Sequence, residues 1–450
     1  MDNRQKLRDA SIEEYIQASK AVKWSASLKN EMIKTFLLVS HIEDVYQVQE
    51  TVSDYKKKII CAELESFLKI EMFDIEKKFK DDCDDISAFK YEKLEIGYKK
   101  YKNVVDEGVL FIKRGSRSIV LDIAYNRENT YNFTVYSHID DSNLASEFLG
   151  NLKSHAEKHN YLRKQKIFPD CTFIELNTGY DWDSVILDKK IKKAIQKNIF
   201  SLTDNIEIYI KNGIALKRGL ILKGEPGVGK TMVGKVLCSS CDCAVIWVTP
   251  KFLERSHNIA NIMSLARDLS PSILFLEDID LYGSERDHNA NKAILGELMN
   301  QLDGITENKN VIIIATTNRG DELEKALRNR PGRFDSVIEI PKPGQLERKE
   351  MLIKYASKFI RPEEKIDFDL IAQKTDKYTG AHIKDLIDLS VMRAISEGNV
   401  GVEDSKIYLT EAIIRKNIKR VGEKKISISD AFHPDKTEDD EGILVDPDEP

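Results

Sequence analysis

The sequence predicts an α/β fold: a three-layer αβα sandwich on a parallel sheet, with a helical lid after it and a mixed α+β domain before it. Three observations support this prediction. Between residues 178 and 345, five short apolar segments alternate with helical patterns, as is typical of βα units. A glycine-rich loop at residues 224–231 joins one of these segments to a helix. Residues 346–424 show helical periodicity throughout.

The composition is that of a globular protein with two to four domains. The chain has 450 residues, of which 41% are hydrophobic and 32% charged, and its net charge is −6. This charge gives no general basic surface, so we do not expect nucleic acid as a partner. No run approaches the roughly 20 apolar residues of a membrane span, and the polar N-terminus lacks the apolar core of a signal peptide. We therefore expect a cytoplasmic protein with no membrane span.

The six cysteines indicate reduced thiols and not a metal site. Cys238, Cys241 and Cys243 are close in sequence, but neither a second cysteine pair nor a histidine pair follows them at zinc-ligand spacing. The other three stand apart from one another. A reducing compartment fits this usage.

Residues 1–170 are expected to form an N-terminal accessory or substrate domain, helical to about residue 105 and then β-rich. The clearest helical pattern covers residues 45–79, where apolar residues recur at three- and four-residue steps among many Lys and Glu. That pattern favours an amphipathic helix pair or a short coiled coil. Residues 108–126 and 129–139 have the composition of strands, and a helix is expected over residues 142–160.

The remainder divides into a core at residues 171–345, a helical lid at residues 346–424 and a tail at residues 425–450. Four of the core strands are runs rich in Ile, Val and Leu, as expected of parallel strands buried on both faces. The tail is acidic and poor in large apolar groups, which predicts disorder. The five expected strands lie at residues 218–224, 244–250, 272–278, 310–318 and 336–343.

Residues 224–231 match the whole phosphate-loop pattern G-x-x-x-x-G-K-[ST], between a strand and a helix as that motif requires. Its glycines let backbone N–H groups surround phosphate oxygens, and the helix N-terminus adds partial positive charge. Lys230 is predicted to neutralise the β- and γ-phosphates of ATP, and Thr231 to bind Mg²⁺. The sandwich is thus of the phosphate-loop NTPase type. The residues expected to contact the nucleotide here are Gly224, Glu225, Pro226, Gly227, Val228, Gly229, Lys230, Thr231 and Met232.

Two further strands end in polar side chains. The strand at residues 272–276 is followed by Glu277 and Asp278, and the strand at residues 310–317 by Asn318. One carboxylate at such a place can support Mg²⁺, and its neighbour can orient or deprotonate the attacking water. From their order we expect Glu277 to support the metal together with Thr231, and Asp278 to act on water. Asn318 belongs to the same edge, where open parallel sheets bind ligands.

Together these motifs resemble the ordered signatures of AAA ATPases of the classical clade. The resemblance covers roughly residues 178–420, and its most specific part is the arginine-containing segment at residues 330–335. It implies that Asn318 senses the γ-phosphate, and that Arg330 and Arg333 act as fingers in the site of a neighbouring subunit. A planar, permanently charged guanidinium suits the charge of a transferring phosphoryl group.

The resemblance also implies where the adenine binds. It places Gly380 and Ala381 on one side of the base, and Val185 and Ile186 on the other. Where the family usually has a glycine after the second pair, this chain has Leu187.

Two departures from the family pattern affect the expected mechanism. The common acidic pair is Asp then Glu, and here it is Glu277 then Asp278. That order is similar to the Rieske-protein translocases of the mitochondrial inner membrane, which begin with a membrane helix not found in this sequence. In the pore loop, many AAA unfoldases have an aromatic-apolar-Gly triplet, and here the residues are Ser256, His257 and Asn258. This argues against threading of polypeptide by aromatic side chains.

We therefore expect an ATPase that uses Mg²⁺, assembles as a homo-oligomeric ring, and remodels or translocates a protein client held by the N-terminal domain. Two alternatives stay open. One is a nucleic-acid remodelling ATPase, which the negative charge disfavours. The other is a nucleotide-gated scaffold with slow hydrolysis, which the reversed acidic pair and the missing aromatic favour. A kinase or small GTPase has no use for the asparagine sensor and the finger arginines.

Overall fold

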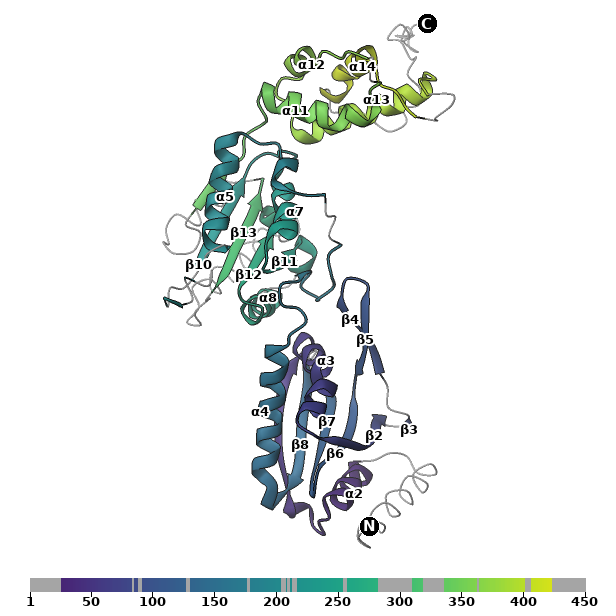
Figure 1. Cartoon of the computed structure of the whole chain (residues 1–450), viewed down its shortest axis with the longest axis vertical. Coiled ribbons are helices and arrows are strands. Elements are labelled where there is room, and N and C mark those ends of the chain that lie inside the picture. The colour runs from purple at the N-terminus through teal and green to yellow at the C-terminus, as the bar shows by residue number, and fades with distance from the viewer. Residues whose placement is uncertain are drawn as a thin grey trace, which may run out of the picture. The chain divides into compact units, whose positions relative to one another are not determined.

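A computed structural model of the chain shows two compact units, Met1–Glu175 and Leu176–Pro450 (Figure 1). Within the described part of the chain, no helix is both long enough and apolar enough to cross a membrane. The structure describes residues 26–82, 85–87, 91–126, 130–175, 179–203, 208, 211–212, 217–253, 257–281, 310–318, 336–361, 364–400 and 406–422.

The first unit is built on an antiparallel sheet with the strand order β1-β8-β7-β6-β2-β3, beside a separate β4–β5 hairpin. Short hairpin connections join β6, β7 and β8, as is usual for antiparallel strands that follow one another in sequence. Its strands are β1 (Val45–Ser53), β2 (Asp74–Asp82), β3 (Asp85–Ser87), β4 (Tyr91–Gly97), β5 (Lys100–Val105), β6 (Gly108–Arg114), β7 (Arg117–Asn126), β8 (Thr130–His138) and β9 (Lys166–Ile167). Its helices are α2 (Ala26–Leu37), η1 (Ile42–Asp44), α3 (Asp54–Ile70), η2 (Ile139–Asp141) and α4 (Ser142–Lys158).

Helix α2 covers one face of this sheet. Phe36 is buried against Phe111 of β6 in an edge-to-face contact, with ring centroids 5.0 Å apart. Val109 and Val120 belong to the same apolar cluster. Helices α3 and α4 pack against each other (Figure 1). Phe67 of α3 meets Phe148 of α4 in an edge-to-face contact, with ring centroids 5.4 Å apart.

The helical prediction for residues 45–79 is wrong at both ends. Only Asp54–Ile70 is helical there, while Val45–Ser53 and Asp74–Asp82 are strands of the sheet. Residues 91–105, also expected to be helical, form the β4–β5 hairpin. Apolar residues at mixed spacing can follow either period over short stretches, and the deciding contacts are hydrogen bonds to distant strands.

The other predicted elements of this unit are confirmed. Residues 108–126 form β6 and β7, most of residues 129–139 form β8, and residues 142–158 form α4. These strands pair along their length, and most side chains of β6 are buried. The alternation and turn signals there agree with the long-range pairing, which is why the prediction holds.

The second unit contains the predicted parallel sheet, with the strand order β14-β10-β13-β12-β11. Every residue of β11, β12 and β13 is buried, as expected of central parallel strands. The αβα prediction is thus confirmed. The elements are η3 (Trp182–Ser184), α5 (Lys189–Thr203), β10 (Lys217–Lys223), α7 (Lys230–Ser240), β11 (Ala244–Val248), η4 (Pro250–Leu253), α8 (His257–Asp268), β12 (Ser272–Leu276), η5 (Ile279–Leu281), β13 (Val311–Thr317) and β14 (Ser336–Glu339).

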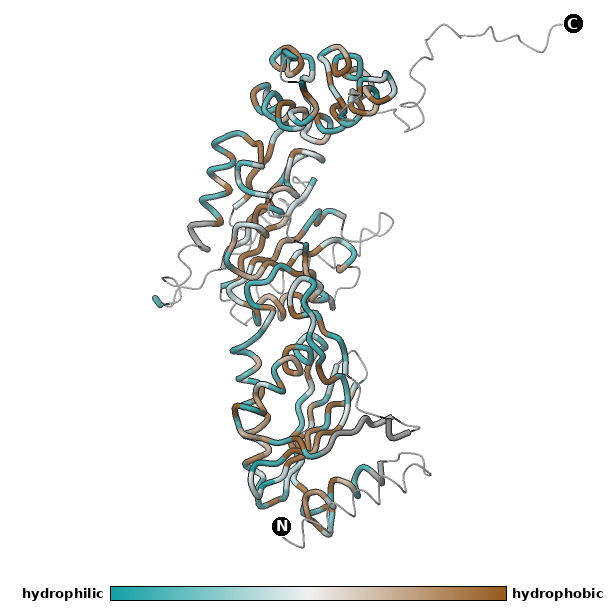
Figure 2. Tube along the Cα trace, turned by 45° about the vertical axis from the view of Figure 1, so that its right-hand side comes forward, coloured by the Kyte–Doolittle hydropathy of each residue, from teal (hydrophilic) through white to brown (hydrophobic). Residues whose placement is uncertain are grey.

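The predicted helical lid follows the sheet and has its own apolar core, which includes Leu352, Ile383 and Ile414. In Figure 2 its helices alternate hydrophobic and hydrophilic residues, whereas the sheet strands are mostly hydrophobic. Arg348 is buried and donates hydrogen bonds to the carbonyls of Pro343 and Ala372, which fixes the start of the lid. The elements are α11 (Gln345–Ala356), η6 (Ser357–Phe359), α12 (Phe368–Lys374), α13 (Gly380–Ser396) and α14 (Glu411–Gly422).

Two further sequence expectations concern the C-terminal tail and the cysteines. The predicted acidic tail at residues 425–450 lies outside the described residues. The five described cysteines are all buried, and none of them forms a disulfide: Cys61, Cys171, Cys238, Cys241 and Cys243.

The Phe36→Ala variant should destabilise the first unit by about 3 kcal/mol, because it removes a buried ring and leaves a cavity between α2 and the sheet. Hydrogen exchange of peptides from β6 and β7 measures this loss. The matched control is Leu38→Ala, at a side chain that is 63% exposed, which should cost less than about 0.5 kcal/mol. Equal protection of β6 in both variants would show that α2 does not stabilise the sheet.

Candidate functional site

The phosphate loop joins β10 to α7, in the strand–loop–helix context that its sequence predicts. Gly227 and Gly229 have φ values of 79° and 108°, a backbone region that glycine adopts without strain. A Cβ on Gly227 would lie 2.6 Å from the Cβ of Ala381, so a side chain there would collide with the lid. The turn and the close approach of the lid both depend on glycine at this position.

Lys230 is the first residue of α7, and its ammonium is folded back into the loop. Nζ donates hydrogen bonds to the carbonyl oxygens of Gly224 at 2.7 Å and Glu225 at 2.9 Å, and to Oδ1 of Asn318 at 2.8 Å. Burial lowers the pKa of Lys230, and the charges of Asp278 and Asp280 act in the opposite direction. The side chain therefore links the loop to the end of β13.

Glu277 lies beside Thr231, the other residue predicted to bind metal. Thr231 Oγ1 donates to Glu277 Oε1 at 2.8 Å, and Trp247 Nε1 donates to Glu277 Oε2 at 3.0 Å. Both carboxylate oxygens are thus oriented by other side chains. Trp247 lies on β11, next to β12 in the sheet. Sequence reasoning missed Trp247, because only the pairing of the strands brings its indole to the carboxylate.

Asp278 follows Glu277 in the left-handed backbone region, with a φ of 46°. Its backbone N–H donates to Thr316 Oγ1 at 2.8 Å. Burial raises the pKa of Asp278, and the neighbouring charges of Glu277 and Asp280 raise it further. A carboxyl with a raised pKa is suited to take up a proton.

Asn318 is oriented by Asp280, a residue that the sequence did not single out. The backbone N–H of Asn318 donates to Asp280 Oδ1 at 2.9 Å, and its side-chain Nδ2 to Asp280 Oδ2 at 3.3 Å. This leaves Oδ1 of Asn318 for Lys230. The ends of β12 and β13 therefore meet at the phosphate loop, as the topology of parallel sheets predicts.

A cleft of about 590 Å³ lies over this edge, between the phosphate loop and the lid. Gly224, Glu225 and Glu277 do not line it; Glu277 instead accepts hydrogen bonds from Thr231 and Trp247. The cleft is also lined by three residues that the sequence did not predict: Tyr180, Tyr355 and Lys384. The predicted residues that line it are Val185, Ile186, Pro226, Gly227, Val228, Gly229, Lys230, Thr231, Met232, Asp278, Asn318, Gly380 and Ala381.

The lid closes one side of the cleft through direct contacts with the loop. The backbone N–H of Ala381 donates to the carbonyl of Gly227 at 3.1 Å. Thr379 caps the N-terminus of α13 in a reciprocal capping box with His382, which sets the direction of that helix. Lys354 Nζ donates to the carbonyl of Ser184 at 2.8 Å, so the lid also holds the segment that carries Val185.

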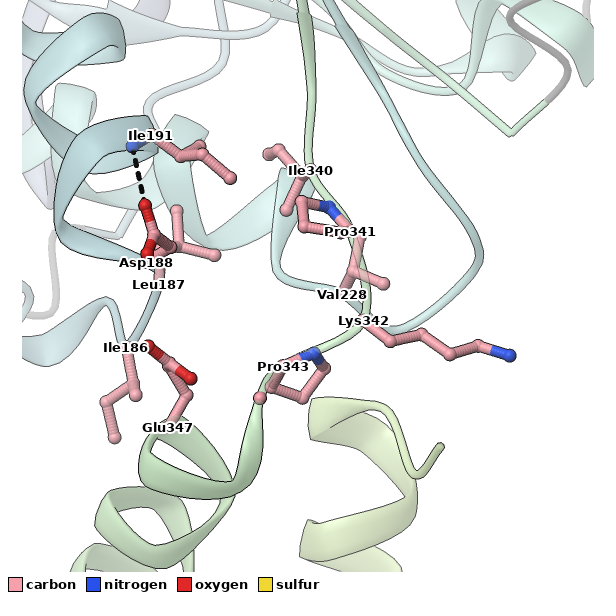
Figure 3. Close-up of a pocket in the computed structure, with 11 residues that line it drawn as sticks. Ile186, Leu187, Asp188, Ile191, Val228, Ile340, Pro341, Lys342, Pro343 and Glu347 are labelled. Carbon is pink, nitrogen blue, oxygen red and sulfur yellow. Dashed lines mark hydrogen bonds between the residues drawn. The ribbon is translucent and has the colours of Figure 1, made fainter. Parts of the chain in front are cut away.

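Leu187 lines a second, smaller pocket (Figure 3). Ile186, Leu187, Val228 and Ile340 line it with apolar side chains, and Asp188 accepts the backbone N–H of Ile191 at the start of α5. Leu187 replaces the glycine that the resemblance implies. Because it lines this pocket and not the larger cleft, it adds apolar packing without occupying the space expected for adenine.

Some predicted site residues lie outside the described residues. These include Arg330 and Arg333, so their action across a subunit boundary stays a prediction. Ser256 is also outside, and α8 begins at His257 directly after it.

Residues 220–342 match the model of the ATPase family associated with various cellular activities (AAA). The 26S proteasome regulatory subunit 8 of Dictyostelium discoideum is 32% identical over 283 residues, covering 60% of this chain and 66% of that protein. The proteasome-activating nucleotidase of Saccharolobus solfataricus is 33% identical over 246 residues, or 50% of this chain and 62% of that protein. The ATPase family gene 2 protein of Saccharomyces cerevisiae is 32% identical over 234 residues, or 50% of this chain and 30% of that protein. The chain therefore matches less than two thirds of the length of each.

The Trp247→Phe variant should need an about 10-fold higher Mg²⁺ concentration for half-maximal nucleotide binding, because it removes a hydrogen bond to a charged oxygen of Glu277. Nucleotide binding titrated with Mg²⁺ measures the change. In a Glu277→Gln background the same substitution should have little further effect. A full effect in that background would show that Trp247 acts by some route other than Glu277.

Proposed function

We propose that this chain, which carries an ATPase domain of the AAA family, hydrolyses ATP to ADP and phosphate with Mg²⁺ in the cleft between its phosphate loop and lid. One observation carries the proposal most directly. The hydroxyl of Thr231 and the carboxylate of Glu277 are 2.8 Å apart, beside the cleft lined by Lys230 and Asp278. Metal ligand, charge and base are therefore available at one sheet edge.

The residues present fit Mg²⁺ and ATP. Mg²⁺ prefers oxygen ligands, and Thr231 and Glu277 would hold it through a hydroxyl and a carboxylate. Bound there, Mg²⁺ supplies charge that offsets the β- and γ-phosphates. The loop glycines leave room for backbone N–H groups to approach phosphate oxygens, and the cleft volume of about 590 Å³ is in the range of ligand sites.

The chain's own groups divide the remaining work. Lys230 exchanges its carbonyl contacts for phosphate oxygens, which needs only rotation of a flexible side chain. Asn318, oriented by Asp280, presents its amide next to that ammonium and can sense the terminal phosphate. Asp278 lines the cleft and, when ionised, can orient a water molecule and accept its proton.

The adenine is expected to bind between Val185 and Ile186 and the pair Gly380 and Ala381, all four of which line the cleft. Because the last two open helix α13 of the lid, nucleotide binding would join lid and core. Closing and opening of this joint gives a route from hydrolysis to movement.

The proposal extends to the assembly of the protein and to its client. Two of the relatives are a proteasome regulatory subunit and a proteasome-activating nucleotidase. By analogy we propose a homo-oligomeric ring, with Arg330 and Arg333 completing the neighbour's site, that acts on a protein client held by the N-terminal unit. The slow, nucleotide-gated scaffold stays the second candidate, because Ser256, His257 and Asn258 supply no aromatic grip.

Replacing Lys230 with Ala should reduce ATP turnover to less than about a tenth, because a charge-assisted contact to the phosphates is lost. Asp278→Asn should retain ATP binding and stop hydrolysis. Steady-state turnover and binding of a fluorescent ATP analogue measure the two effects. Normal hydrolysis by Asp278→Asn would transfer the water-activating role to Glu277, and normal turnover by Lys230→Ala would refute the proposed site.

The turnover number should fall as the pH is lowered. The midpoint of this fall should lie above 3.8, the ordinary pKa of an aspartate, because burial raises the pKa of Asp278. The base form is the active one, so activity is present above this pKa and is lost as pH falls through it. Single-turnover rates at saturating Mg²⁺ and ATP give the profile. In Asp278→Glu the acid limb should move, and an unchanged limb would assign the titration to another group.

The two finger arginines should act between subunits. Arg333→Ala should lower turnover by up to about 10³-fold with little change in ATP affinity, since a finger stabilises charge that develops in the transition state. Mixing this variant with Lys230→Ala subunits should restore part of the activity, because some interfaces then pair an intact loop with an intact finger. No recovery in rings shown to be mixed would place the arginine's action within its own subunit.

A further inference from the structure

The first unit contains a second group of ligand-type side chains, unrelated to the nucleotide site. Glu63 of α3, His155 of α4 and His159 at the end of α4 each offer one ligand atom, and these atoms lie within 4.8 Å of one another. Nε2 of His155 is 3.7 Å from Oε2 of Glu63. The two imidazole rings have their centroids 4.2 Å apart. Three groups that metals prefer are thus nearly in contact.

Helix packing assembles this group. His155 and His159 are four residues apart, so they lie one turn apart on the same face of α4. Helix α3 packs against α4 (Figure 1). It contributes Glu63, whose ligand atom lies within 4.8 Å of those of the two histidines. Phe67 of α3 packs on the ring of His155, with centroids 5.7 Å apart, and on Phe148 of α4. These apolar contacts fix the helix separation independently of any ligand.

Hydrogen bonds orient the three side chains. Nδ1 of His159 is 2.9 Å from the carbonyl oxygen of His155, which fits donation by that nitrogen and leaves Nε2 as the free lone pair. Ser66 Oγ lies 2.8 Å from Oε2 of Glu63 and 3.0 Å from Nε2 of His155. Metal-binding histidines commonly have this arrangement, in which the second nitrogen donates to a carbonyl and fixes the ring.

We propose that Glu63, His155 and His159 bind a divalent transition-metal ion of the Zn²⁺ type, with water in the fourth position. Two imidazoles and one carboxylate are a zinc ligand set, whereas Mg²⁺ and Ca²⁺ prefer oxygen ligands alone. Zinc bonds of about 2.0–2.2 Å place tetrahedral ligand atoms about 3.4 Å apart. Side-chain rotation closes the present spacing, and the exposed ring of His159 gives the ion access. The ion would tie α3 to α4.

Cobalt titration of the full-length, tag-free and nucleotide-free protein tests the proposal, after treatment with a chelator and dialysis. Four-coordinate Co²⁺ has intense visible absorption, and Zn²⁺ should displace it. We expect wild type to bind one such Co²⁺ per chain, and His159→Ala and Glu63→Gln to bind it at least about 10-fold more weakly. The matched control is His41→Ala, which changes an exposed histidine of the same unit outside the cluster and should bind as wild type does.

Thermal unfolding gives a second readout, because a ligand that binds the folded state raises Tm. Zn²⁺ should raise the Tm of wild type and His41→Ala, and not that of His159→Ala. Circular dichroism before titration shows that the variants are folded. The proposal is overturned if wild type shows no four-coordinate Co²⁺, or if His159→Ala and Glu63→Gln both keep the wild-type affinity.

Discussion

The geometry of the nucleotide site depends on the hydrogen bonds that the buried ammonium of Lys230 donates. Taking a charge out of water is costly, and the lowered pKa of Lys230 reflects that cost. Three oxygens compensate for it, two from the loop backbone and one from Asn318 of the next strand end. Because one side chain bonds to both, the loop and β13 hold a common geometry. An incoming phosphate would take the place of the two carbonyl oxygens after rotation of the Lys230 side chain.

The reversed acidic pair is accommodated by a difference in reach. Glu277 is one methylene longer than aspartate, and it extends to Thr231 and Trp247. Asp278 is shorter and adopts a left-handed backbone that aspartate tolerates better than most residues. The turn keeps Asp278 on the cleft, while Glu277 accepts the hydrogen bond from Thr231. In the proposed mechanism, the first acidic position therefore supports the metal and the second acts on water, although Glu and Asp have exchanged places.

The sequence predicted most of the second unit, because its signals are local. The phosphate loop, the apolar strands and the polar strand ends need only neighbouring residues to be recognised. It did not predict Trp247 or Asp280, which reach the site through strand pairing. In the first unit, the mixed spacing of apolar residues over residues 45–79 is compatible with a helix. Two parts of this stretch are strands because β1 pairs with β8 and β2 pairs with β6. The four-residue spacing of His155 and His159 can be read from the sequence, but Glu63 comes close to them only because α3 packs against α4.

The central claim, that Glu277 supports the metal and Asp278 acts on water, is tested most directly by Mn²⁺ bound with a non-hydrolysable ATP analogue. Electron paramagnetic resonance measures both the affinity and the ligand field of the ion without requiring turnover. Glu277→Gln should weaken Mn²⁺ binding by about 10-fold or more and change the spectrum, while Asp278→Asn should leave both close to wild type. The opposite pattern, with Asp278→Asn releasing the ion and Glu277→Gln retaining it, would contradict the assignment.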